Sequence, residues 1–239
     1  KQKTAYEIYQ CDWSSDVCSS DLESRDQGGQ GEQGDRGDQG NPGQSGKSGI
    51  PGNPRQPGRR LRIGYVSGDF HRQHPVNIFM LPVLLRHDHT RFEICIYHTG
   101  SMHDEYTRQA RASADRWLEA AALDDKALQQ AILADGIDVL VDLAGHTSTH
   151  RLGLFAMRAA PVQATFLGYP HSTGLSTIDW IIGDATVSPA GHADLFSEGI
   201  AQMPASVFCW APVDDYPLPA ARAAEAAPVF GSFNNAMKL

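Results

Sequence analysis

The chain has 239 residues and a formal net charge of −8, with 41% hydrophobic and 20% charged residues. This acidic balance argues against nucleic acid or an anionic membrane surface as the main partner, because both are bound by clustered Lys and Arg. No apolar run approaches the length of a membrane span. Cys95 and Cys209 lie within apolar runs, where a free thiol packs as a small hydrophobic group. Without a disulfide framework, the sequence favours a cytoplasmic protein.

Two N-terminal segments differ in composition from the rest of the chain. Residues 1–22 resemble the in-frame translation of a short-read sequencing adapter. Residues 23–60 are collagen-like, with glycine at every third position from Gly28 to Gly52. That repeat indicates either a trimerising stalk or a chimeric or out-of-frame assembly. Neither segment can bury a core, so we expect both to be disordered in a monomer.

The first half of the globular region alternates between strand and helix patterns. Its predicted elements, in chain order, are a strand from Leu61 through LRIGYVSGDF, a helix through NIFMLPVLLRH to His87, a buried strand over residues 92–98, and helices over residues 105–114 and 124–134. Asp124 or Asp125 is the expected N-cap of the last helix, and Gly136 its end.

Three apolar runs of strand length follow, at spacings that admit a short helix: residues 136–143, 162–168 and 178–184. Strands that alternate with helices over such short distances imply βαβ units with right-handed crossovers. We therefore predict an α/β fold with a Rossmann-like, doubly wound parallel sheet. The first βα turn reads SGDFH and lacks the GxGxxG fingerprint, which argues against a nicotinamide or flavin cofactor.

Loops rich in Gly, His, Thr and Ser follow the predicted strands. Ligands of open parallel sheets bind beyond the carboxyl ends of the strands, so residues 145–150 and 168–174 are the first candidates for a binding site. Five histidines also follow predicted strand ends: His71, His74, His98, His146 and His171. A histidine there can donate to a phosphate or sugar hydroxyl, or act as acid or base.

Two other chemistries find less support. His71 and His74 are three residues apart, and His146 and His150 four apart, but neither pair has the intervening Glu and the helix of a HExxH zinc site. We therefore expect no metal ion. No Gly-x-Ser-x-Gly elbow or Cys/His signature indicates nucleophilic catalysis.

Several motifs at consistent spacing resemble one known family. They are RIGYVSGDFHRQHPV (residues 62–76), residues 135–175, IDWIIGD, the triplet at 196–198 and FGSFNNAMKL (residues 230–239). Together they resemble the O-GlcNAc transferase/SPINDLY family of glycosyltransferases. The resemblance implies a GT-B architecture with two Rossmann-like lobes, in which residues 61–225 are the N-terminal lobe and residues 226–239 begin the nucleotide-binding lobe.

The resemblance also implies an activity, which is inverting transfer of N-acetylglucosamine from UDP-GlcNAc to Ser or Thr of proteins, without a metal or other cofactor. Some members of the family transfer fucose from GDP-fucose, and a non-catalytic sugar-nucleotide or peptide binding module is a further alternative. Tetratricopeptide repeats are expected in the full-length protein. Because most of the second lobe is missing, we expect a fragment with little or no activity alone.

Carried over by position, His74 matches the family's active-site histidine and Lys238 the lysine that contacts the donor's diphosphate. Displacement at the anomeric carbon needs a base that removes the acceptor's proton and a cation that stabilises the departing diphosphate. A neutral imidazole and a lysine suit these two roles. The residues expected to border the donor or acceptor are Pro75, Gly145, His146, Thr147, Gly168, Tyr169, Pro170, Thr173, Gly174 and Asn235.

Overall fold

The computed structural model describes residues 58–72 and 74–211. Within them, seven strands form one sheet in the order β3-β2-β1-β4-β5-β6-β7, and each neighbouring pair is parallel. The strands are β1 (Leu61–Ser67), β2 (Phe92–His98), β3 (Arg116–Glu119), β4 (Val139–Asp142), β5 (Val162–Phe166), β6 (Trp180–Asp184) and β7 (Gly199–Met203). The predictions for residues 1–22, for 23–57 and for 226–239 lie outside the described residues.

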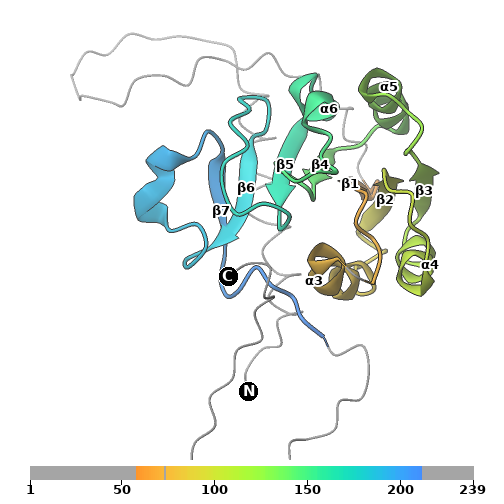
Figure 1. The fold of residues 1–239 in the computed structure, drawn as a ribbon, viewed down its shortest axis with the longest axis horizontal. Helices are drawn as coiled ribbons and strands as arrows, with labels where there is room; N and C mark the ends of the chain where they lie inside the picture. The colour runs from red at the N-terminus through yellow and green to blue at the C-terminus, as the bar shows by residue number, and fades with distance from the viewer. Residues whose placement is uncertain (1–57, 73, 212–239) are drawn as a thin grey trace, which may run out of the picture.

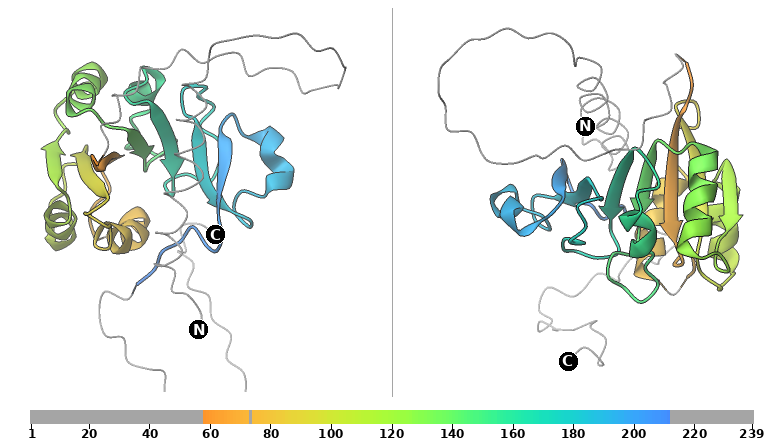
Figure 2. Two further views of the ribbon diagram at one scale, coloured as in Figure 1. Left: turned by 180° about the vertical axis from the view of Figure 1, so that it is seen from behind. Right: turned by 90° about the horizontal axis from the view of Figure 1, so that it is seen from above.

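Helices cover both faces of this sheet (Figure 1). They are α3 (Pro75–Leu84), α4 (Glu105–Ala112), α5 (Asp125–Asp135) and α6 (Leu152–Ala156), and a 3-10 helix, η1 (Ala190–Leu195), lies beside the β7 edge (Figure 2). Helices α3 and α4 lie on one side of the sheet, and α5 and α6 lie on the other. The predicted α/β, Rossmann-like doubly wound parallel sheet is confirmed.

Two hydrophobic cores result, one on each face. In β2, Ile94 and Ile96 pack into the core that includes Met80 of α3, whereas the alternate residues Cys95 and Tyr97 pack into the core on the opposite face. Because helices cover both faces, the strands are apolar at consecutive positions instead of alternating with polar residues. This arrangement explains why the runs in the sequence look continuous.

The helix boundaries have local causes. Asp104 caps α4 in a capping box with Thr107, and Asp124 caps α5 by accepting from the backbone N–H of Ala127. Gly136 ends α5 at a φ of 62°, in the left-handed region that glycine adopts without a side-chain clash. Asp124 and Gly136 are therefore the predicted cap and end of α5.

The strands at the two edges of the sheet, β3 and β7, were missed by the sequence prediction. Both are short and only partly buried, and RWLE and GIAQM carry polar side chains that a continuous apolar run excludes. The predicted helix to His87 also ends earlier, at Leu84. No helix in the described part of the chain is long and apolar enough to cross a membrane.

The core on the α5–α6 face should be sensitive to truncation. Leu140 is fully buried at the centre of the sheet, so Leu140→Ala should lower the free energy of unfolding by about 3 kcal/mol through lost burial and a cavity. Leu133 on α5 is 41% exposed, and Leu133→Ala should change stability by less than about 0.5 kcal/mol. Urea denaturation of both variants checks this difference, and equal losses would contradict the assignment of the core.

Candidate sugar and acceptor site at the strand ends

The sheet reverses its winding between β1 and β4. From β1 the chain builds outward through β2 and β3, and from β4 it builds outward the other way through β5, β6 and β7. Ligands of open α/β sheets bind beyond the carboxyl ends of the strands at such a switch point. The segments that follow β1, β4 and β5 contain nearly all the described residues that the sequence analysis selected.

The loops after β4 and β5 approach so closely that only glycine fits at two positions. A Cβ atom on Gly145, whose φ is 57°, would lie 2.3 Å from the Cβ of Tyr169. A Cβ atom on Gly168 would lie 2.0 Å from the carbonyl oxygen of Leu143. Both distances are below any real contact, so these glycines are required for the two loops to pack together.

Asp142, the last residue of β4, holds the loop after β4 through hydrogen bonds. Its buried carboxylate accepts hydrogen bonds from the backbone N–H groups of Ala144 (3.1 Å) and Gly145 (2.8 Å) and from the hydroxyl of Thr165 (2.9 Å). Burial raises the pKa of Asp142, although these hydrogen bonds favour the ionised form. In the same loop, the Thr147 hydroxyl oxygen is buried without a hydrogen-bond partner in the described structure.

Side chains also join the two loops. The ring Nε2 of His146 lies 2.9 Å from the carbonyl oxygen of Thr173, and the His146 and Tyr169 rings meet edge to face at 5.3 Å. The rings of His171 and Tyr169 also meet edge to face, at 6.0 Å. The His146 side chain thus connects the loop after β4 with the turn at residues 172–174.

Glu198 holds that turn in place from the segment just before β7. Its buried carboxylate accepts from the hydroxyl of Ser172 (2.7 Å), the backbone N–H of Thr173 (2.8 Å) and the hydroxyl of Thr173. Burial alone would raise the pKa of Glu198, but the hydrogen bonds from Thr173 and Ser172 outweigh it and hold the pKa below its ordinary value.

His74 stands at the N-cap of α3, and its ring is about one-third exposed. Its Nδ1 lies 3.4 Å from the backbone N–H of Val76 and 3.7 Å from the carboxylate of Asp69. These two neighbours favour opposite tautomers, since the N–H needs a bare Nδ1 and the carboxylate needs a protonated one. Asp69 is buried and also receives the Thr149 hydroxyl at 3.3 Å, so it joins the His74 segment to the loop after β4.

The structure therefore brings most of the predicted residues to one edge of the sheet. Pro75 is the first residue of α3, and Pro170 and Gly174 are exposed in the loop after β5. Lys238 and Asn235 lie outside the described residues. The roles assigned to all of these residues stay predictions.

Sequence reasoning missed three carboxylates that organise the site: Asp69, Asp142 and Glu198. All three are at most 4% exposed. Asp142 ends an apolar strand and Asp69 lies two residues after one, and an acidic residue there needs hydrogen-bond donors to be buried. That position was a usable signal, whereas Glu198 gains its partners from a turn 25 residues away.

The fold and the loops at its strand ends are typical of an α/β lobe that binds a ligand. A family model described as "Glycosyl transferase family 41" matches residues 50–217. The chain belongs to glycosyl transferase family 41, and the predicted resemblance to the O-GlcNAc transferase/SPINDLY family is confirmed.

Named relatives agree. The probable UDP-N-acetylglucosamine–peptide N-acetylglucosaminyltransferase SPINDLY of Solanum lycopersicum is 36% identical over 189 residues, which cover 77% of this chain and 20% of the relative. The UDP-N-acetylglucosamine–peptide N-acetylglucosaminyltransferase of Caenorhabditis elegans is 36% identical over 157 residues, covering 64% of this chain and 13% of the relative. The chain thus spans about a fifth, or less, of the length of these relatives.

A solved structure supports the same conclusion. The structure of an O-GlcNAc transferase mutant from Thermobaculum terrenum superposes with a TM-score of 0.64 at 39% sequence identity. The match covers 70% of this chain and 32% of that chain. The described lobe therefore corresponds to one part of a larger glycosyltransferase structure.

The close packing of the two loops can be tested with a pair of glycine substitutions. Gly145→Ala should lower the free energy of unfolding by about 3 kcal/mol, because it combines a positive φ with a clash against Tyr169. Gly174 has a φ of 74° but open space around it, so Gly174→Ala should cost only about 1 kcal/mol. Urea denaturation measures both, and a Gly174→Ala loss as large as that of Gly145→Ala would contradict the loop contact.

The Glu198 network predicts a pH dependence. Its folded-state pKa is depressed, so its stabilisation is present above the ordinary glutamate value of 4.5 and is lost as the pH falls through the folded pKa. Glu198→Gln should lower the free energy of unfolding by about 1–2 kcal/mol at neutral pH and should flatten its decline below about pH 4.5. Denaturant titrations over this range check both effects. Asp194→Asn, at an exposed position of η1, is the control, and a decline in Glu198→Gln as steep as in the parent would sink the prediction.

Proposed function

We propose that this chain supplies the N-terminal lobe of an inverting protein O-glycosyltransferase that transfers N-acetylglucosamine from UDP-GlcNAc to Ser or Thr of proteins. One observation carries the proposal most directly. In a member of glycosyl transferase family 41, the segment that contains Asp69 and His74 lies at one switch point of the sheet together with the loops after β4 and β5. Hydrogen bonds from Thr149 to Asp69 and between His146 and Thr173 join these three parts.

The chemistry of such a transfer fits the groups at this edge. The acceptor hydroxyl oxygen attacks the anomeric carbon while the bond from that carbon to the diphosphate oxygen breaks, and UDP leaves with inversion. The acceptor proton passes to a base, for which His74 Nε2 is suited when Nδ1 is protonated and faces Asp69. Asp69 thereby acts as a positioning residue, because it favours the tautomer that leaves Nε2 free.

The donor and acceptor contacts follow from the same placement. We assign the unpartnered Thr147 hydroxyl and the backbone of the loop at residues 168–174 to the sugar and the acceptor. Lys238 would neutralise the diphosphate, so the transfer step needs no metal ion or other cofactor. UDP-GlcNAc is favoured over GDP-fucose because the names of the relatives from Solanum lycopersicum and Caenorhabditis elegans specify UDP-N-acetylglucosamine.

The wider setting of the enzyme belongs to the same proposal. Its partners would be proteins with Ser or Thr acceptors, recognised with the help of tetratricopeptide repeats in the full-length protein, and neither nucleic acid nor a membrane would take part. A nucleotide-sugar donor and protein acceptors of this kind suit the cytoplasm. A binding module without catalysis is the rival interpretation, and the role of His74 distinguishes the two.

His74→Ala tests the role of the histidine. The assay uses a chain extended at its C-terminus with the corresponding region of the Thermobaculum terrenum relative, which supplies the expected nucleotide-binding lobe. Loss of the base should lower kcat for transfer to a Ser/Thr peptide by about 10²- to 10⁴-fold. The KM and Kd for UDP-GlcNAc should stay within about threefold, because the imidazole acts on the acceptor proton.

His192→Ala is the matched control, since His192 is exposed on η1 and should leave kcat unchanged. Mass spectrometry of the peptide gives the transferred sugar directly. An unchanged kcat in His74→Ala would argue against catalysis by His74. Donor binding without transfer by the parent extended chain would favour the binding module.

A further inference from the structure

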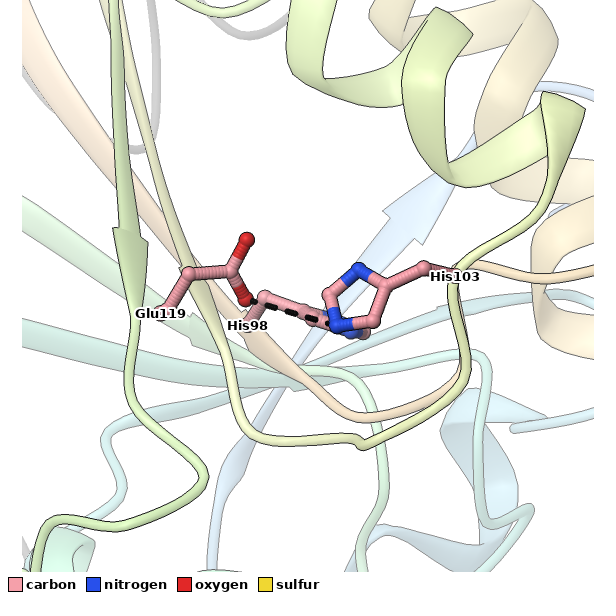
Figure 3. Close-up of side chains that lie close together, drawn as sticks. All are labelled: His98, His103 and Glu119. Atoms are coloured by element: carbon pink, nitrogen blue, oxygen red, sulfur yellow. Dashed lines mark ion pairs between the residues drawn. The ribbon is translucent and has the colours of Figure 1, made fainter.

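Three side chains outside the candidate transfer site lie close together at the carboxyl ends of β2 and β3. They are His98, the last residue of β2, His103, in the loop before α4, and Glu119, the last residue of β3 (Figure 3). One ligand atom from each lies within 4.8 Å of the others. The closest printed pair is Nε2 of His103 and Oε2 of Glu119, at 4.0 Å.

His98 is an unusual residue to find in this position. It is 0% exposed and packs against the rings of Trp117 (5.2 Å) and Phe70 (6.1 Å), yet neither ring nitrogen makes a hydrogen bond of good geometry. The backbone carbonyl oxygens of Met102 and Ser67 lie near the ring, but outside the geometry of a hydrogen bond. A buried imidazole without a well-formed partner is costly unless something else satisfies it.

Glu119 is already oriented by its other oxygen. Oε1 accepts from the indole N–H of Trp117 at 2.8 Å and lies 3.4 Å from a guanidinium nitrogen of Arg111. Oε2 is therefore the oxygen that faces His103. Neighbours that hold the non-ligating oxygen of a carboxylate, or accept from the second nitrogen of a histidine, are typical of the surroundings of metal ligands.

We propose that His98, His103 and Glu119 form a binding site for a divalent transition-metal ion, with Zn²⁺ as the best fit. Two imidazole nitrogens and one carboxylate oxygen are a recurrent zinc ligand set that leaves the fourth position to water. Tetrahedral bonds of about 2.0–2.1 Å place ligand atoms roughly 3.3 Å apart. The site must therefore contract by up to about 1.5 Å, which the exposed side chains of His103 and Glu119 permit.

Among the described residues, Glu119 faces the cluster through Oε2, and the guanidinium of Arg111 lies on the Oε1 side of the same carboxylate. The ligating side of the cluster is thus left to the two imidazoles and one anionic oxygen.

The site would have a structural consequence for the loop that carries His74. His103 immediately precedes Asp104, whose carboxylate accepts from the backbone N–H of Arg72 at 2.8 Å. Thr107 in the first turn of α4 donates to the carbonyl oxygen of Phe70 at 2.6 Å. A metal ion that fixes His103 would therefore stiffen the support of residues 70–72 and, through them, of His74. The proposal goes beyond the transferase function and does not depend on it.

Zinc titration of the untagged 239-residue chain, after removal of metal with a chelator, tests the proposal. Calorimetry near pH 7.5 should show one saturable site, and Zn²⁺ at about 100-fold above its Kd should raise Tm by roughly 5–10 °C. His103→Ala and Glu119→Gln should each weaken binding by more than about tenfold and remove most of the Tm rise. Both positions are exposed, so these variants are expected to fold.

His192→Ala is the matched control and should bind Zn²⁺ as the parent does, because His192 is exposed and lies on η1, outside the cluster. The absence of saturable binding would overturn the proposal and leave His103 and Glu119 as an ordinary ion pair. Binding that survives in both His103→Ala and Glu119→Gln would overturn it as well. If that binding were lost in His71→Ala, the ion would belong to the pair His71 and His74, whose rings lie 5.7 Å apart.

Discussion

Buried carboxylates at the ends of the strands hold the loops of this lobe in shape. Asp142 accepts two backbone N–H groups of the loop after β4, and Asp184 at the end of β6 accepts those of Thr186 and Val187 at 2.8 Å and of Val207 at 2.9 Å. Glu198 does the same for the turn at residues 172–174. Each loop leaves a parallel strand with unpaired backbone donors, and a buried anion satisfies several of them at once.

The pKa values of these carboxylates depend on the balance between burial and hydrogen bonding, and this balance differs among them. Burial dominates at Asp142 and raises its pKa, whereas at Asp184 and Glu198 the hydrogen bonds dominate and lower the pKa. Asp142 is the last residue of β4, which lies between β1 and β5 in the sheet, and it is almost completely buried. Because Asp142 belongs to the sheet and accepts from the backbone of the loop after β4, it fixes the positions of Gly145 and Thr147 relative to the sheet. Rigid elements place binding groups more accurately than free loops do.

The sequence predicted the sheet well because its central strands are buried on both faces. The runs that contain Ile94 to Tyr97 and Val139 to Val141 can be read without tertiary knowledge, and Gly136 marks a helix end through its own backbone preference. The edge strands β3 and β7 carry polar residues and depend on pairing with β2 and β6, which no local pattern reports. Local sequence patterns were therefore sufficient to predict the central strands of the sheet but not its two edge strands.

The candidate site follows the same division. Histidines and glycines after strand ends could be selected from sequence because topology alone brings the carboxyl ends of parallel strands to one edge. The contacts that give those residues a role could not, since Asp69 meets Thr149 across 80 residues and Glu198 meets Thr173 across 25. His98 was selected for a binding role at the strand ends, yet its ring lies in a buried aromatic setting beside His103.

That difference between His74 and His98 follows from the elements that carry them. His74 caps a helix at the switch point and keeps a ring that is about one-third exposed, which suits exchange of a proton with a ligand. His98 ends β2 against the rings of Trp117 and Phe70 and is fully buried, which suits a fixed ligand of the proposed ion. Asp104 and Thr107 link the two regions by hydrogen bonds to the His74 segment. A metal ion that fixes His103 would thus restrict the motion of His74 through these hydrogen bonds, without any change in the sheet.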